Sequence, residues 1–204
     1  MDRFNDILDF WFEGIDEDTV ITKDSEFVKR WFGKDKKVDE AIRQNFKEDL
    51  ASAQRGEYGE WKKTPAGRLA LIILFDQFPR HLYRETARAF ENDLQALELC
   101  LRSIKDHFDE GLIFVERQFL YMPLMHSENM AIQEESLKYF GRLVKEAEET
   151  SDPNVDYLKY VLGYAQRHYD IVKRFGRFPH RNAMLKRRAT SHELEFVKKP
   201  EANF

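Results

Sequence analysis

The longest uninterrupted apolar run of this chain is Leu69-Ala70-Leu71-Ile72-Ile73-Leu74-Phe75. It follows Thr64-Pro65, in which the threonine can cap a helix and the proline suits the first helical turn. A helix start ahead of the run favours a helix over a strand, and apolar residues on every face favour burial. The run therefore predicts a central buried helix.

The rest of the chain also keeps the helical period of apolar residues. Short apolar stripes end in the aromatic pairs Trp11-Phe12 and Trp31-Phe32, each followed closely by a glycine. Longer helices are predicted over about 39–54, 92–107, 114–126, 130–149 and 155–175, and a short one at the capping box of Thr190 and Glu193. No segment alternates between apolar and polar residues with a period of two, so the predicted fold class is all-α.

A single all-helical domain over residues 1–204, with a polar tail from about residue 198, is the expected organisation. Antiparallel helix pairs with short connections suggest a superhelical helix stack. The sequence lacks a convincing repeat of roughly 34 residues, so such a stack would be degenerate, and a compact helical bundle is the alternative.

The charge balance excludes some classes of partner. Acidic and basic residues nearly cancel at a net charge of −4, so the whole molecule has no field that favours nucleic acid or an anionic membrane. The single cysteine, Cys100, argues against a disulfide framework and fits a reducing compartment. The first residues lack the pattern of a secretory signal, and no run reaches the roughly 18 apolar residues that span a bilayer. We therefore expect a soluble, cytoplasmic protein.

The pattern Phe-x-x-Phe-Pro occurs twice, at Phe75-Asp76-Gln77-Phe78-Pro79 and at Phe175-Gly176-Arg177-Phe178-Pro179. Arg80-His81 follows the first copy and His180-Arg181 follows the second. Because proline disfavours helical backbone angles in the residue before it, each helix is predicted to end near the second Phe. Cationic side chains would then be presented at two bends.

Arginine is concentrated near these two bends, where a local basic site could form. Its planar fork holds a carboxylate or phosphate through two parallel hydrogen bonds. The candidate ligand-binding residues are Arg80, Arg84, Arg177, Arg181, Asn182 and His168. In the alternative interpretation, these arginines pair with Asp76, Glu85, Glu116 and Glu128 and serve only the structure.

His126-Ser127-Glu128 and His180 are the candidates for proton transfer. Pro123 is expected to turn His126 away from its helix axis, and imidazole is a suitable acid or base near neutral pH. The candidate catalytic residues are therefore His126 or His180 as general acid or base, with Glu128 orienting the imidazole. His-x-Glu does not match the spacing of a helical zinc site, so neither a metal nor a cofactor is expected.

Four strings carry a resemblance to a known family: LALIILFDQFPRHLYR (69–84), TARAF (86–90), FLYMPLMHSE (119–128) and FGRFPHRN (175–182). They are similar to the signatures of the domain of unknown function 924, a mainly bacterial family, over nearly the whole chain. The resemblance implies a single tetratricopeptide-like domain of antiparallel helices. It implies no activity, substrate or cofactor.

Three functions are compatible with these residues. The first is a binding module whose Arg/His-lined pocket holds an anionic small molecule or an acidic peptide. The second is an enzyme that acts on a phosphorylated or carboxylated metabolite. The third is a purely structural arginine network with a role in protein interaction. Nucleic acid and membrane are not expected partners, and the sequence does not indicate an oligomeric state.

Overall fold

A computed structural model describes residues 2–199 and 202, and this part of the chain is built from helices and contains no strand. The α-helices are α1 (Arg3–Phe12), α2 (Glu26–Phe32), α3 (Lys36–Gln54), α4 (Pro65–Ile72), α5 (Phe78–Leu82), α6 (Asp93–Lys105), α7 (Phe114–Met125), α8 (Met130–Thr150), α9 (Val155–Phe175) and α10 (Ser191–Phe196). The all-α prediction is confirmed. None of these helices combines the length and apolarity that crossing a lipid bilayer requires.

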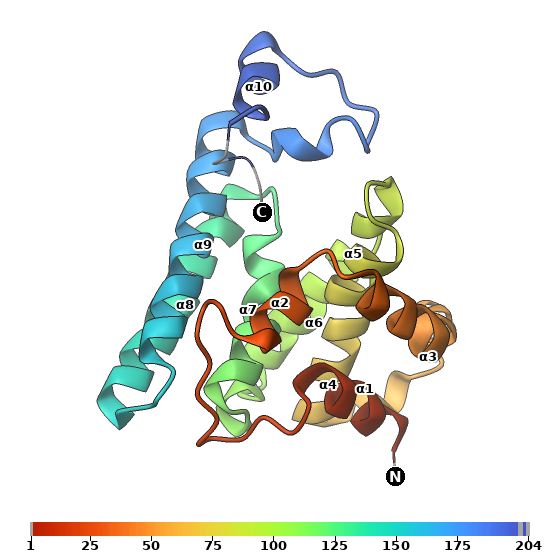
Figure 1. The fold of residues 1–204 in the computed structure, drawn as a ribbon, viewed down its shortest axis with the longest axis vertical. Helices are drawn as coiled ribbons and strands as arrows, with labels where there is room; N and C mark the ends of the chain where they lie inside the picture. Colours follow the sequence, from red (N-terminus) through yellow and green to blue (C-terminus); the bar gives the residue numbers. More distant parts are fainter. Residues whose placement is uncertain (1, 200–201, 203–204) are drawn as a thin grey trace.

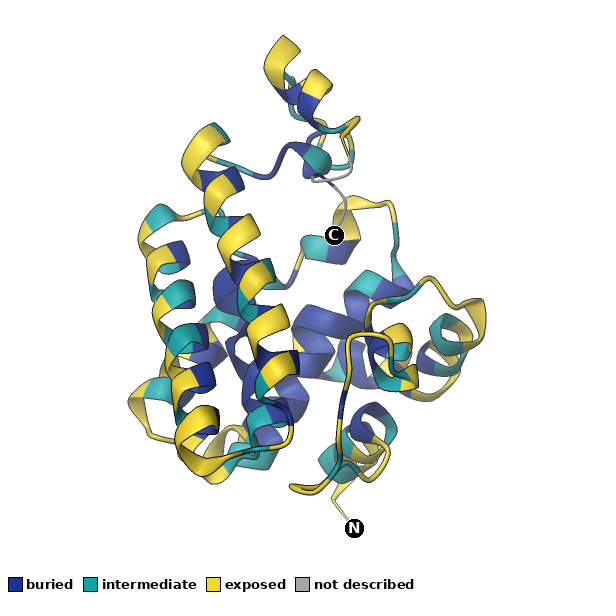
Figure 2. Cartoon of the chain, turned by 60° about the vertical axis from the view of Figure 1, so that its left-hand side comes forward, coloured by how far each residue is buried: buried dark blue, intermediate teal, exposed yellow. Residues whose placement is uncertain are grey.

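The central helix forms where the apolar run predicted it. The Thr64 hydroxyl accepts a hydrogen bond from the Gly67 N–H, and Pro65 occupies the first turn of α4. Every side chain from Leu69 to Leu74 is at most 1% exposed, because α1, α6 and α7 surround the run. Figure 2 shows this buried interior in dark blue.

The first Phe-x-x-Phe-Pro segment corrects the sequence prediction, because the helix does not end at Phe78. A π turn, η2 (Ile73–Gln77), follows α4, and the Phe78 N–H donates to the carbonyl of Ile73, five residues back. Pro79 lacks an N–H, and its ring would clash with the carbonyl four residues back in a regular α-helix. The wider π turn avoids that conflict, so the helix continues through α5 to Leu82.

Aromatic side chains from the N-terminal helices close the core. Trp11 packs edge-on against Phe78 and Phe119, and Trp31 packs against the same Phe119 ring. The Trp31 indole N–H donates to the carbonyl of Trp11 over 2.8 Å. These contacts fix α1 and α2 to α5 and α7. The latter two helices also carry candidate site residues.

Helices α7, α8 and α9 lie side by side in sequence order, and α8 and α9 form a long pair on one side of the molecule. Each of these two helices buries one face and exposes the other. This arrangement of consecutive neighbouring helices is compatible with a tetratricopeptide-like stack.

The chain turns back over the top of the molecule after α9. Gly176 adopts a φ of +70°, which ends the helix, and the 3₁₀ turn η5 (Pro179–Arg181) follows. A small second core holds this end together and consists of Ile171, Val172, Phe178, Phe196 and Ala202. Of the polar tail expected from residue 198, residues 200, 201, 203 and 204 lie outside the described residues.

Candidate functional site

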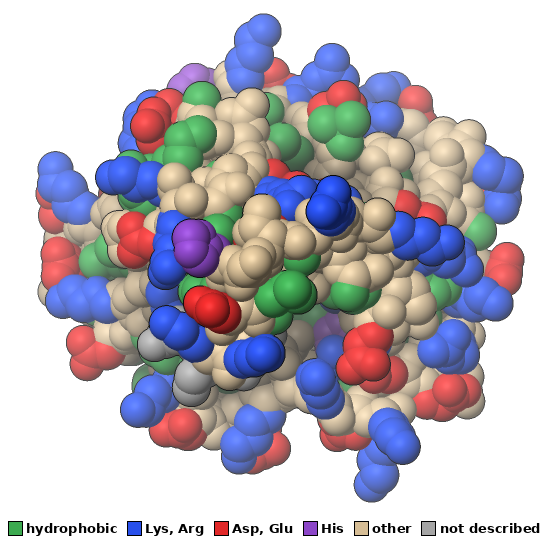
Figure 3. Space-filling model, turned by 90° about the horizontal axis from the view of Figure 1, so that it is seen from above, with side chains coloured by type: hydrophobic (Ala, Val, Ile, Leu, Met, Phe, Trp, Pro, Cys, Tyr) green, Lys and Arg blue, Asp and Glu red, His purple; other side chains and the backbone are tan. Residues whose placement is uncertain are grey.

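Three distant segments meet at the upper end of the molecule, which Figure 3 shows from above. They are the η2–α5 segment, the end of α7 and the turn after α9. Together with Asp93 of α6 and His168 of α9, they form a group of charged and histidine side chains, called the Arg-His cluster below. It comprises Asp76, Arg80, Asp93, His126, His168, His180 and Arg181.

Asp93 connects the two arginines of the cluster. Its Oδ1 lies 3.0 Å from Arg80 Nη1, and its Oδ2 accepts a hydrogen bond of 3.0 Å from Arg181 Nη1. Both guanidinium groups also face the ring of Phe90, at 5.8 Å and 4.5 Å from its centroid. The 3₁₀ turn η3 (Ala87–Phe90) and the first residue of α6 therefore contribute the side chains that hold the two proline bends together.

Each of these arginines keeps a buried donor that is not used. Arg80 Nη2 and Arg181 Nε have no hydrogen-bond partner among the described residues. The Arg181 side chain is only 8% exposed, so these donors are not simply in open solvent. A buried N–H group without an acceptor lowers the stability of the folded protein. Two such groups on neighbouring guanidiniums could both donate to one bound anion.

Asp76 orients His126. The fully buried carboxylate lies 2.7 Å from His126 Nδ1 and 3.4 Å from Arg80 Nη1. Burial alone would raise the pKa of Asp76, but the charge of Arg80 and the contact with His126 outweigh it and lower this pKa. Asp76 is therefore ionised, and the geometry favours the tautomer in which His126 Nδ1–H donates to it.

The three histidines of the cluster are neutral in the folded protein. Burial lowers the pKa of His126 and of His168, with further contributions from Arg80 and from His126 respectively. Burial and the neighbouring charge of Arg181 lower the pKa of His180 to about 3. The rings lie in a chain: His126 and His168 have centroids 5.8 Å apart, and Phe178 stands between His168 and His180 at 5.4 Å and 5.6 Å.

Two predicted ligand-binding arginines lie in other networks. Arg84, two residues after the end of α5, donates two hydrogen bonds of 2.7 Å to Asp39, which ties this segment to α3. Arg177 forms a similar fork with Glu193 over 2.6 Å and 2.8 Å, which fixes α10. Because both forks are already occupied by a carboxylate, the structure does not bring these residues into the cluster.

Glu128 and Asn182 border the cluster without contacting the His126 ring. Glu128 accepts a hydrogen bond from the Phe178 N–H and forms an ion pair with Arg187. The Asn182 side-chain oxygen accepts a bond from the same Arg187. The acid hydrogen-bonded to His126 is thus Asp76 and not the predicted Glu128.

The sequence predicted Asp76 only as an acid that would pair with an arginine, and it gave Asp93 no role at the two bends. Phe90 entered only within a family string. The spacing after Phe75 does give one usable signal, because Asp76 and Arg80 are four residues apart and can interact on one helix face. Within residues 2–199 and 202, no three His, Cys, Asp or Glu side chains are arranged to hold a metal ion.

Comparison with known proteins gives a family but no activity. No curated protein matches the chain. A solved structure of a protein of unknown function from Agrobacterium tumefaciens is similar, with a TM-score of 0.74 and 31% identity over 96% of each chain. The family model described as a bacterial protein of unknown function (DUF924) matches residues 7–201, and the chain therefore belongs to this family.

Proposed function

We propose that the protein binds a small carboxylate or phosphate anion at the Arg-His cluster. The observation that carries the proposal is the pair of unused donors, Arg80 Nη2 and Arg181 Nε, on two guanidiniums that share one acid. An oxyanion that accepts from both would complete their hydrogen bonding, and charge-assisted bonds of this kind are stronger than neutral ones.

The burial of the cluster favours a small anion over an acidic peptide. Arg181 is 8% exposed at its side chain and Arg80 is 21% exposed. A peptide backbone would need more accessible surface, whereas a single carboxylate or phosphate group can reach a recessed donor. The acidic peptide of the sequence analysis is therefore the less favoured ligand.

The charges of the cluster predict that binding is linked to a proton. Arg80 and Arg181 are already balanced by Asp76 and Asp93, so a bound anion adds a negative charge that nothing nearby offsets. An anion next to a neutral imidazole raises its pKa. We therefore expect a histidine of the cluster to take up a proton when the anion binds.

An enzyme that acts on such an anion is the second candidate function. The contact between Asp76 and His126 favours it, since a carboxylate on Nδ1 fixes the tautomer and leaves the lone pair on Nε2 for a proton transfer. A substrate that is turned over should then still bind to His126→Gln without being converted.

Isothermal titration and thermal denaturation with phosphate, sulfate and citrate test the binding proposal. Arg181→Gln removes a donor of the cluster, and Arg84→Gln is the matched control, because Arg84 sits in a separate ion pair with Asp39. An anion present at about 100 times its Kd should stabilise the native protein and Arg84→Gln by about 2.7 kcal/mol. It should stabilise Arg181→Gln much less.

Equal stabilisation of both variants would refute the cluster as the binding site. No stabilisation of the native protein by any of the three anions would favour the purely structural network. If Arg181→Gln does not fold, Arg181→Lys keeps the charge while losing the planar fork and is still expected to weaken binding.

A further inference from the structure

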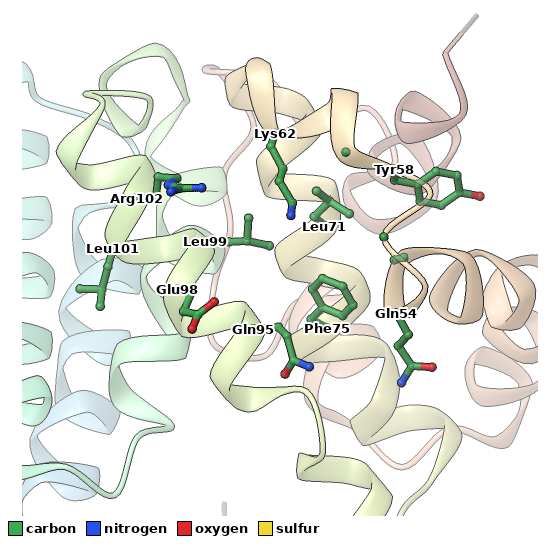
Figure 4. A pocket seen from close by; sticks show the side chains of 13 residues that line it. Gln54, Tyr58, Lys62, Leu71, Phe75, Gln95, Glu98, Leu99, Leu101 and Arg102 are labelled. Carbon is green, nitrogen blue, oxygen red and sulfur yellow. The ribbon is translucent and has the colours of Figure 1, made fainter.

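A groove on the side of the molecule lies outside the Arg-His cluster. Its floor is formed by Leu71 and Phe75 of the central helix, with Leu99 of α6 beside them (Figure 4). The end of α3 and the loop around Tyr58 form the opposite wall. The cavity volume is about 640 Å³, within the range of small-molecule sites.

Two basic side chains point into this groove. In Figure 4, Lys62 from η1 and Arg102 from α6 reach toward the same part of it. Both residues are exposed, and among the described residues no ion pair or side-chain hydrogen bond occupies either charged end. Glu98 and Gln95 lie closer to the N-terminus of α6 than Arg102 does. One part of the groove is therefore lined by two cations, and the other part is lined by one acid.

The turn that carries Lys62 is held in place. Lys62 belongs to the 3₁₀ turn η1 (Gly59–Lys63), and its carbonyl accepts a 2.5 Å hydrogen bond from Arg68 Nε. Arg68 is buried, pairs with Asp106 over 2.6 Å and covers the ring of Phe108 at 4.2 Å. The Lys62 backbone is therefore fixed while its ammonium group can still adjust to a ligand.

From this arrangement we infer that the groove binds an amphipathic monocarboxylate. Its carboxylate lies between Lys62 and Arg102, and its apolar body lies against the exposed edges of Phe75 and Leu99, which are 5% and 6% exposed. Each methylene group that leaves water contributes about 0.8 kcal/mol, so an aliphatic chain supplies affinity that a short acid lacks. Glu98 repels a second negative charge, which disfavours dicarboxylates.

Titration calorimetry with decanoate, decanol and decanedioate tests the inference. Decanoate should bind the native protein at least about tenfold more tightly than either of the other two probes. Lys62→Gln and Arg102→Gln should each weaken decanoate binding by about tenfold. Lys63→Gln is the matched control, since Lys63 is engaged by Glu60 at 2.6 Å and does not line the groove.

Decanol that binds as tightly as decanoate would overturn the inference, because the two cations would then contribute nothing. Equal affinity of Lys62→Gln and Lys63→Gln for decanoate would overturn it as well. The inference does not depend on the anion site: Arg181→Gln should leave decanoate binding unchanged, so the two proposals can fail separately.

Discussion

Arg80 and Arg181 approach each other because one carboxylate, Asp93, lies between them. Two cations held this close are tolerated only while an acid or a bound anion separates them. Burial, opposed by Asp93 and aided by the charge of Arg80, lowers the pKa of Arg181 from its ordinary value, although the group stays cationic. Asp93 therefore competes with a bound anion for the two guanidinium groups.

Asp93→Asn tests that preference directly. The substitution removes the shared countercharge, so the free energy of unfolding should fall by about 3 kcal/mol, the scale of a broken buried ion pair. Phosphate should bind about tenfold more tightly, because a competing acid is gone. Urea denaturation and titration calorimetry measure the two effects, and weaker phosphate binding would contradict this role of Asp93.

Acid should destabilise the unliganded protein through the histidines of the cluster. Their pKa values are lowered on folding, so the unfolded chain binds protons first, and stability present above about pH 6.5 is lost as the pH falls. Between about pH 7.5 and 5.5, His180 alone contributes a loss of about 1.4 kcal/mol.

Urea midpoints at these two pH values check this expectation, with His180→Gln as the comparison. The variant should lose about 1.4 kcal/mol less on acidification than the native protein. The lowered pKa of His81, outside the cluster, affects both proteins equally. An identical loss in the two proteins would contradict a neutral, buried His180.

Acid should have the opposite effect on anion affinity. If a histidine takes up a proton with the anion, the affinity for sulfate, whose own charge stays constant, should rise by up to about tenfold per pH unit below pH 7. Calorimetry in two buffers of different ionisation enthalpy measures the proton directly. A sulfate affinity that does not depend on pH would show that no proton is taken up.

At the scale of single elements, the helix ends decide where the cluster residues point. The π turn Ile73–Gln77 places Asp76 and Arg80 together while Pro79 stays in the helix. The rule that a helix ends before proline does not predict this π turn. The π turn removes the clash of the proline ring with the preceding turn, and its formation depends on how the flanking apolar residues pack. At the second copy the helix does end ahead of the proline, because Gly176 terminates α9 three residues earlier.

Two glycines of the α9 region offer a matched pair of substitutions. Gly176 has a φ of +70°, so Gly176→Ala should lower the free energy of unfolding by about 1 kcal/mol through backbone strain. Gly163 lies inside α9 with open space around it, so Gly163→Ala should raise the free energy of unfolding by about 1 kcal/mol. Thermal denaturation measures both, and a stabilising Gly176→Ala would contradict the described turn.

At the scale of the whole molecule, the apolar pattern predicted more than the polar pattern did. The helical periods located α9 and the capping box of α10 correctly, because burial of apolar surface and helix capping act locally. The partners of Arg84 and Arg177 are Asp39 and Glu193, on other elements. Their pairing depends on how the helices pack, and one sequence without its fold does not contain that information.

Hydrogen exchange should divide the molecule into a slow and a fast part. Amides of α4 and α7 lie in the main core and should exchange slowest, whereas α10 rests on the small second core and should open more often. Saturating phosphate should slow exchange in residues 178–188, since the anion links η5 to α5. Mass spectrometry of peptic fragments measures this, and protection confined to α10 would contradict the linkage.

Diffraction from crystals soaked in selenate locates a bound anion in the cluster, because the selenium atom reports its own position. We expect an anomalous peak between the two arginines, with oxygens about 2.8 Å from Arg80 Nη2 and Arg181 Nε. A selenate ion bound elsewhere, with these two nitrogens still lacking an acceptor, would contradict it.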